Sequence, residues 1–458
     1  MGKLRDFFKP IDMTVGSPAR NIVMFAIPML LGNIAQQLYN TVDSIIVGKF
    51  VGDNALAAVG SAGPILNLML VLFMGISTGA SIMVSQYYGA RQREDLSKTI
   101  GCCIFLTAVA SAFIMIVGTL LTGPMLKMLN TPEAIIGWCK GYLTIIFLGI
   151  AGGGYYNILG GVLRGLGDSF SALVYLVVAT LLNIVLDYTF VAYLGMGVNG
   201  VALATVIAQF VSAFLTLRRL TQMTDLFDMK KEYLKPEAKY TKRLVSLGLP
   251  SGLTQAVFSM SMIVVQSLTN SFGEMYIAAN VIVMRVDGFV MLPAFSFGTA
   301  MTTFAGQNIG AQRMDRVDEG VKKGTLIAVC TSAVLTGLIV LFGRYIMSIF
   351  TDTEALIDTA NRCMRILAVG YIAMEVTQCL SGVMRGAGDT VTPMWISLLT
   401  SVIIRVPLAY LLVGMTRTAE NPRGDFFMMT RSGLLSWLLG ALLTFIMFRI
   451  GRWRKKAL

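Results

Sequence analysis

Long apolar segments alternate with short polar connections along the whole chain of 458 residues. A helix needs about twenty predominantly apolar residues to cross a bilayer, so the pattern predicts an all-α integral membrane protein with twelve transmembrane helices. Segments that exceed the bilayer thickness must tilt or kink, and Pro28 and Pro250 offer kink points. The expected spans are 21–50, 55–86, 97–122, 134–163, 170–194, 197–219, 241–270, 276–308, 318–343, 355–385, 391–415 and 431–450.

The two halves of the chain repeat one another. The stretch GGVLRGLGD (160–168) returns 221 positions later as SGVMRGAGD (381–389), and the same offset carries Gln86 onto Gln307. Matches at one spacing indicate a duplication. Each half holds an even number of spans, so both insert in the same orientation. We therefore expect two six-helix lobes related by a pseudo-twofold axis along the membrane normal, with the substrate between them.

The distribution of basic residues predicts the topology. The two ends and the connections after even-numbered spans carry 26 Lys and Arg residues, against nine beside the other connections. Positive charge stays on the cytoplasmic side, so both termini should be cytoplasmic, in the inner or plasma membrane of the cell. The expected organisation is an amphipathic N-terminus (1–20), an N-lobe (21–219), an interlobe linker (220–240), a C-lobe (241–450) and a basic tail (451–458).

Composition narrows the possible functions. The chain is 55% hydrophobic and 14% charged, has a mean hydropathy of +0.71, and lacks histidine. Its six cysteines show no ligand spacing, so we expect neither a metal cluster nor another cofactor. The net charge of +12 is explained by topology and by contact with anionic lipids, and nucleic acid is not an expected partner. The first twenty residues have no apolar core, so the first span should act as its own signal.

Two aspartates lie deep within the first lobe. Asp187 follows Asn183 by four residues on one helical face, and Asp43 lies at a similar height, about seven residues before the outer end of its span. Thr205 and Asn157 are candidates for the same pocket. Charge in the membrane is costly and marks function, and an oxygen-rich pocket suits Na⁺ at Asp43, Asn183 and Asp187, or a proton shared between carboxylates that cannot both ionise cheaply. The alternative is that Asn183 and Asp187 only link helices by hydrogen bonds.

The second lobe lacks this polar pair, because Ile404 and Leu408 occupy the positions of Asn183 and Asp187. Cation binding should therefore be confined to the first lobe. The ionisable residues that remain inside the spans of the second lobe are balanced in sign, which favours internal salt bridges over substrate contact. They are Arg285, Asp287, Glu375 and Arg405. The repeated RGxGD turns should have glycine at positive φ and an N-capping aspartate, Asp168 or Asp389.

The motifs, in this order, resemble those of the multidrug and toxic compound extrusion (MATE) family over nearly the whole chain. They are NTVDSIIVGKFVGDNALAAVG (40–60), SQYYGARQ (85–92), RGLGDS (164–169), LLNIVLDY (181–188), LGLPSG (247–252), GQNIGAQ (306–312) and RGAGDT (385–390). The resemblance implies a monomeric antiporter that exports organic, cationic or amphipathic compounds by alternating access, coupled to H⁺ or Na⁺.

Asp43, Asn183 and Asp187 match the family's cation-binding positions on the first and fifth helices, and Asn157 and Thr205 resemble the supporting residues, as in the DinF-like branch. The NorM-like branch also uses acidic residues of the second lobe. Gln255 stands near one of those positions, and Glu375 lies close to the other but is not clearly in register.

Three other readings remain open. A lipid or lipid-linked oligosaccharide flippase of the same superfamily should have a strongly basic central cavity, whereas Arg285 and Arg405 each have an acidic candidate partner. An intramembrane aspartyl enzyme would have to use Asp43 and Asp187 as its pair. A passive channel should show a ring of charge along its pore and does not require a duplicated chain.

Overall fold

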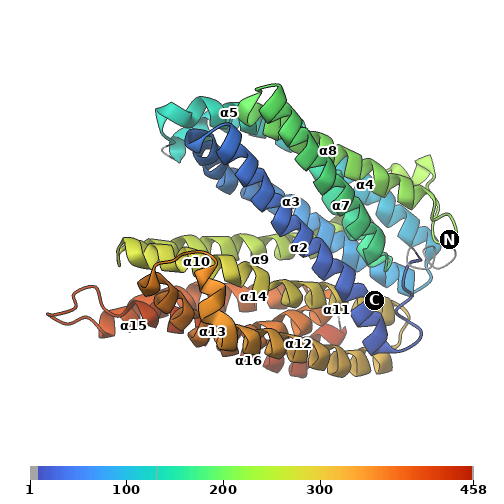
Figure 1. Cartoon of the computed structure of the whole chain (residues 1–458). Coiled ribbons are helices and arrows are strands. Elements are labelled where there is room, and N and C mark those ends of the chain that lie inside the picture. The colour runs from blue at the N-terminus through green and yellow to red at the C-terminus, as the bar shows by residue number, and fades with distance from the viewer. Residues whose placement is uncertain (1–8, 130, 456–458) are drawn as a thin grey trace. The chain divides into compact units, whose positions relative to one another are not determined.

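The computed structural model describes residues 9–129 and 131–455, and all regular elements within this part of the chain are helical. Figure 1 shows them as long helices joined by short connections. The helices are α2 (Pro18–Phe50), α3 (Asp53–Gly89), α4 (Arg93–Met128), α5 (Glu133–Leu148), α6 (Ile150–Gly165), α7 (Ser169–Asp187), η1 (Tyr188–Tyr193), α8 (Gly197–Thr221), η2 (Lys231–Leu234), α9 (Ala238–Asn270), α10 (Glu274–Val290), α11 (Leu292–Gly310), α12 (Met314–Ser348), α13 (Glu354–Gly386), α14 (Val391–Leu398), η3 (Leu399–Ile404), α15 (Arg405–Met415), α16 (Phe426–Ile450) and η4 (Arg452–Lys455).

Eleven described helical segments are long and apolar enough to cross a membrane, and the bent pair of α5 and α6 makes a twelfth. The twelve expected spans each have a counterpart among them. The expected span 134–163 is broken at Gly149, where the two helices meet at 52°. A side chain at Gly149 would collide with Val206 of α8, so the glycine permits the close approach of α8 at the bend.

Two further spans contain a turn of π-helix, which the hydrophobic pattern does not reveal. The element η1 follows α7 directly after Asp187, and η3 joins α14 to α15. A π-helical turn holds one more residue than an α-helical turn and occurs frequently at functional sites. In both spans it shifts the direction of the side chains that follow.

The chain forms two compact units. The first comprises the described part of Met1–Asp12 with Ile27–Gly252, and the second comprises Met13–Ala26 with Leu253–Leu458. The helix α2 therefore contributes residues to both, and Pro28 lies at the point of division. Each unit has its own apolar core, which is continued on the outer surface by large apolar side chains.

The same close helix crossing recurs in each unit. In the first unit, a Cβ atom on Gly161 of α6 would lie 2.5 Å from the carbonyl oxygen of Ser77 on α3. In the second unit, Gly382 of α13 meets the carbonyl oxygen of Gly298 on α11 in the same way. Small residues let membrane helices approach backbone to backbone. The same backbone-to-backbone contact is therefore present in both halves of the chain.

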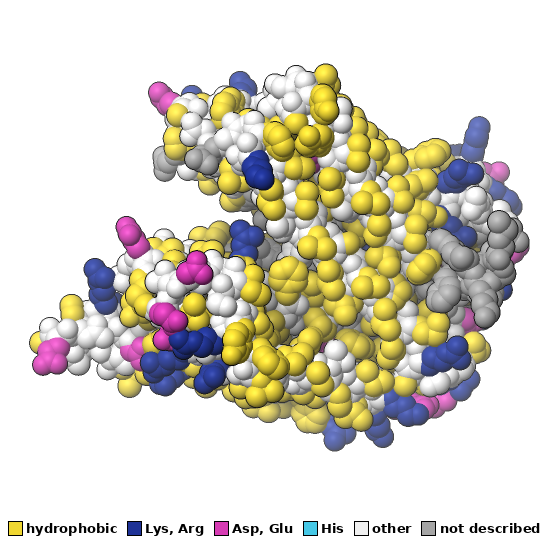
Figure 2. All heavy atoms as spheres, viewed as in Figure 1, with side chains coloured by type: hydrophobic (Ala, Val, Ile, Leu, Met, Phe, Trp, Pro, Cys, Tyr) yellow, Lys and Arg dark blue, Asp and Glu magenta, His cyan; other side chains and the backbone are white. Residues whose placement is uncertain are grey.

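The surface has the distribution of a membrane protein. Apolar side chains cover the lengths of the helices, and Lys, Arg, Asp and Glu side chains gather at helix ends (Figure 2). Ion pairs there include Arg93 with Asp228 at 2.8 Å and Arg313 with Asp315 at 3.0 Å.

The two RGxGD turns have the predicted conformation. Gly167 has φ of 89° and Gly388 has φ of 92°, values that favour glycine. Asp168 caps α7 by accepting hydrogen bonds from the backbone N–H and hydroxyl of Ser171 at 2.9 and 2.8 Å. It also pairs with Arg219 at 3.0 Å. Burial raises the pKa of Asp168, and the contacts with Ser171 and Arg219 only partly offset this rise.

Candidate functional site

A cluster of polar side chains lies inside the first unit, on α2, α7 and α8. The helix α2 presents Tyr39 and Asp43, which are one turn apart, and α7 presents Asn183 and Asp187 with the same spacing. Residues four apart lie on one face of a helix, so two polar pairs face inward from two helices. Thr205 of α8 completes the cluster. Asn183 and Asp187 are fully buried, and Thr205 is 9% exposed.

Hydrogen bonds link these side chains. The hydroxyl groups of Tyr39 and Thr205 lie 3.2 Å apart. Both polar atoms of the Asn183 side-chain amide have hydrogen-bond partners when its nitrogen faces Asp187. The nitrogen then donates to Oδ2 of Asp187 at 2.9 Å, and the oxygen accepts from the backbone N–H of Thr205 at 3.3 Å. The amide thereby fixes the position of the Asp187 carboxyl relative to α8.

The carboxyl groups of Asp43 and Asp187 are within hydrogen-bonding reach of each other. The Oδ1 atom of each is buried and has no hydrogen-bond partner. None of the ion pairs in the described chain supplies a Lys or Arg to either residue. Two adjacent buried carboxylates without a counter-charge repel each other strongly. The pair therefore requires a proton between its oxygens or a bound monovalent cation.

The available ligands fit either ion. Carboxylate, amide and hydroxyl oxygens are the donors that hard cations prefer, and the two unpartnered Oδ1 atoms are positions from which Asp43 and Asp187 could hold Na⁺. A proton needs only the contact between the two carboxyl groups. Among the described residues no group of three or more His, Cys, Asp and Glu side chains is arranged to hold a metal ion.

The structure brings together four of the five residues expected at this site. Asn157 makes no hydrogen bond to the other four among the described residues, and its side-chain amide donates to the carbonyl oxygen of Gly153 in its own helix at 2.9 Å; its place in the site stays a prediction. Sequence reasoning missed Tyr39, although its spacing of four residues before Asp43 was a usable signal. It also missed Tyr142 of α5, which is 6% exposed and lies close enough to interact electrostatically with both aspartates.

In the second unit, apolar residues replace the cluster. The offset of 221 carries Tyr39 and Asp43 onto Met260 and Val264, which are exposed on the surface. Ile404 and Leu408 take the positions of Asn183 and Asp187. The carboxylate pair is therefore a feature of the first unit.

The ionisable residues of the second unit do not form the salt bridges expected from the sequence. Arg285 is exposed, and none of the ion pairs within 4 Å in the described chain includes it. Asp287 accepts a hydrogen bond from the hydroxyl of Tyr371 instead. Arg405 has an unpartnered Nε, and Glu375 is 1% exposed with an unpartnered Oε1. Equal numbers of acidic and basic residues did not predict salt bridges correctly, because the count contains no information on the distances between their side chains.

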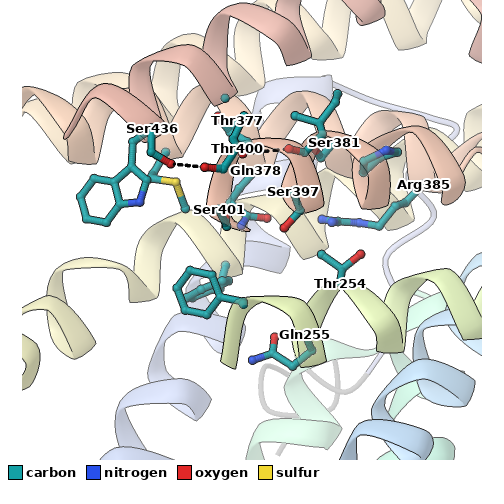
Figure 3. Close-up of a pocket in the computed structure, with 17 residues that line it drawn as sticks. Thr254, Gln255, Thr377, Gln378, Ser381, Arg385, Ser397, Thr400, Ser401 and Ser436 are labelled. Carbon is teal, nitrogen blue, oxygen red and sulfur yellow. Dashed lines mark hydrogen bonds between the residues drawn. The ribbon is translucent and has the colours of Figure 1, made fainter. Parts of the chain in front are cut away.

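A cavity of about 120 Å³ lies inside the second unit (Figure 3). Gln255 of α9 lines it, as do Gln378 and Arg385 of α13, whereas Glu375 does not. The sequence singled out Gln255 and gave no indication of the cavity, since the hydroxyl-bearing residues of its lining are spread over five elements. Arg385 had been assigned only to a turn.

The fold is that of a membrane protein with two helical units, and the comparisons with known proteins give its class as a transporter rather than an enzyme. The MatE family model matches residues 28–189 and again 250–411, one match in each half of the duplicated sequence. The chain belongs to the MatE (MATE) family.

Named relatives agree with this assignment. "Probable multidrug resistance protein YoeA" of Bacillus subtilis is 31% identical over 405 residues, which cover 87% of this chain and 88% of that one. "Probable multidrug resistance protein NorM" of Thermotoga maritima is 24% identical, covering 96% and 94%. A solved structure of a "MOP superfamily transporter from Pyrococcus furiosus" has the same fold, with a TM-score of 0.89, 24% identity and 98% of each chain covered.

Proposed function

We propose that the protein is a cation-coupled antiporter that exports organic compounds, with the cluster around Asp43 and Asp187 as its coupling site. The observation that carries this proposal is the pair of adjacent carboxyls without a basic partner, one on the buried Asp187 and the other on the half-buried Asp43. The names of the multidrug resistance relatives support organic compounds as the exported substrate.

Coupling requires the ion to bind the two transport conformations with different free energy. Asp43 lies on α2 and Asp187 on α7, so a small displacement of α7 against α2 changes the distance between the two carboxyls. The π-helical turn after Asp187 offers such a displacement, since a π-helical turn can become an α-helical one by a shift of one residue. Taking up H⁺ or Na⁺ draws the helices together, and its release on the other side lets them separate.

The exchange proceeds by alternating access. The outward-open protein takes up the ion at Asp43 and Asp187, releases the organic compound outside, and then carries the ion inward. We further propose that the protein acts as a monomer in the cell membrane with both termini in the cytoplasm, and that it belongs to the DinF-like branch, in which the first lobe holds the coupling site.

Purified protein in sealed liposomes tests the proposal. A fluorescent organic cation is loaded, and its movement is followed under a proton gradient and a sodium gradient imposed separately. We expect one gradient to drive transport, Asp43→Asn to abolish it, and Asp352→Asn, in an exposed loop, to leave it unchanged. Gradient-driven transport by Asp43→Asn at the normal rate would refute the assignment of the site. Absence of transport of any tested cation by the normal protein under either gradient would refute the exporter.

A further inference from the structure

The cavity in the second unit has a mixed lining, in which polar side chains lie among apolar ones such as Phe258 and Trp437. Hydroxyl and amide side chains from α9, α13, α14, η3 and α16 face it, and no acidic residue is among the described residues that line it. Its principal polar residues are Thr254, Gln255, Gln378, Ser381, Ser397 and Ser401. These groups can both donate and accept hydrogen bonds, so the preference for a ligand that accepts them comes from Arg385, which only donates.

Arg385 contributes the charge of this lining. Its guanidinium group points into the cavity, toward Ser397 and Thr254 in the view of Figure 3. Among the described residues, none makes a hydrogen bond or an ion pair with it. Asp389 instead accepts from the backbone N–H and hydroxyl of Thr392, at 3.2 and 2.7 Å. Glu375 precedes Arg385 by ten residues on α13, which is about 15 Å along the helix.

The repeat explains why this guanidinium lacks a protein partner. Arg164 is its equivalent in the first unit, and its Nη2 donates to the hydroxyl of Ser77 at 3.1 Å. The offset of 221 carries Ser77 onto Gly298, which has no side chain to accept. The close helix crossing at this point is kept in both units, whereas the hydroxyl acceptor is present only in the first.

Arg385 is half-buried, and its guanidinium presents five N–H donors to the cavity without a counter-charge from the protein. Since a single water occupies roughly 10–15 Å³ of cavity volume measured in this way, the cavity of about 120 Å³ holds a small anion with several waters. We propose that this cavity is a binding site for a carboxylate or phosphate group, with Arg385 as its charge partner and hydroxyls such as that of Ser397 as further donors. This site is separate from the cation cluster, and its existence does not depend on the direction of transport.

Iodide quenching of tryptophan fluorescence tests the site, because Trp437 lines the cavity. The full chain, purified in detergent, is titrated with iodide at constant ionic strength set by a bulky sulfonate salt. We expect a saturable quenching component that Trp437→Phe removes and that acetate or inorganic phosphate competes away. Quenching that rises linearly with iodide and is unaffected by either competitor would overturn the proposal.

Three variants assign the binding to Arg385. Arg385→Gln should weaken iodide and phosphate binding by about tenfold or more, since a charge-assisted hydrogen bond is lost. Arg417→Gln removes the same charge from an exposed loop of the same unit and should bind within about twofold of the normal protein. Gly298→Ser restores an acceptor for the guanidinium and should also weaken binding. It requires its neighbour Gln378 to move by only a few tenths of an ångström. Normal binding in both Arg385→Gln and Gly298→Ser would refute the assignment.

The anionic group could come from a solute or from a lipid headgroup, and nanodiscs distinguish these sources. With a solute, acetate and phosphate compete with iodide equally in phosphatidylcholine and phosphatidylglycerol nanodiscs. With a lipid headgroup, phosphatidylglycerol alone suppresses the saturable quenching. Either result supports the anion site, and saturable quenching absent from both kinds of nanodisc would contradict it.

Discussion

Replacing Asp187 by Asn should weaken binding of the coupling ion far more than replacing an uncharged residue of the same cluster. The substitution keeps size and shape, and the new amide can still accept the hydrogen bond that Asn183 donates to this position at 2.9 Å. What it removes is one negative charge beside Asp43. A carboxylate and a cation about 4 Å apart interact by about 4 kcal/mol at an effective dielectric constant of about 20. That loss corresponds to about a thousandfold weaker binding.

Tyr39→Phe provides the internal comparison. It removes one neutral hydroxyl contact, the 3.2 Å approach to Thr205, and such a bond contributes about 1 kcal/mol net. We therefore expect a loss of about fivefold in ion affinity. Both variants should give a single folded species in size-exclusion chromatography and a cooperative thermal unfolding transition, as the normal protein does.

The assay measures binding of radioactive Na⁺ and uptake of protons by the same purified samples, alongside gradient-driven efflux from liposomes. The reasoning predicts a ratio of at least about a hundredfold between the effects of the two substitutions, because one removes a charge and the other a dipole. Similar, small effects of both would show that the carboxyl pair does not hold the ion, even if transport is lost for another reason.

Three further predictions concern the second unit, the helix crossings and the turn. Glu375→Gln should retain ion-driven efflux, since Glu375 has no second carboxyl facing it; loss of coupling in liposomes would move part of the site into this unit. Gly382→Ala should lower the unfolding free energy by about 1–3 kcal/mol or more through overpacking at Gly298, whereas Gly337→Ala, with open space around it, should stabilise α12 by up to about 1 kcal/mol; equal melting temperatures would contradict the close crossing. Because burial raises the pKa of Asp168, the folded protein keeps a proton that the unfolded chain releases, so this contribution to stability falls as pH rises from about 4 toward the raised pKa. The melting temperature of Asp168→Asn should therefore fall less than that of the normal protein over this pH interval. An equal fall in both proteins would contradict the raised pKa of Asp168.

The architecture could be predicted from the sequence because bilayer thickness imposes a long, strong hydrophobic signal. The duplication and the turns around Gly167 and Gly388 were likewise predictable, since a positive φ has a specific residue requirement. The break at Gly149 and the π-helical turns were not, because they depend on contacts between helices distant in sequence.

The candidate sites differed in how far the sequence could predict them. A carboxylate inside an apolar span is conspicuous, so Asp43 and Asp187 could be singled out without a structure. Tyr39 was not conspicuous, because tyrosine is common in membrane helices. The cavity in the second unit could not be predicted, because serine and threonine hydroxyls in helices usually bond to their own backbone, as Thr400 does with Ile396 at 2.8 Å. Only the tertiary structure shows which of them face a common space.

The close crossings of α6 with α3 and of α13 with α11 also bear on how the two half-chains diverged after duplication. Each crossing is fixed by glycines whose replacement would displace backbone, whereas the residues lining the neighbouring spaces can change without moving it. Selection could therefore retain the ancestral framework while Ser77 and Gly298, or Asp43 and Val264, became different. The two copies then came to differ in chemistry: the first holds an acidic pair, and in the second the arginine that both copies share faces a glycine in place of its serine partner. Relatives should accordingly vary in the chemistry of these linings more readily than in the glycines beside them.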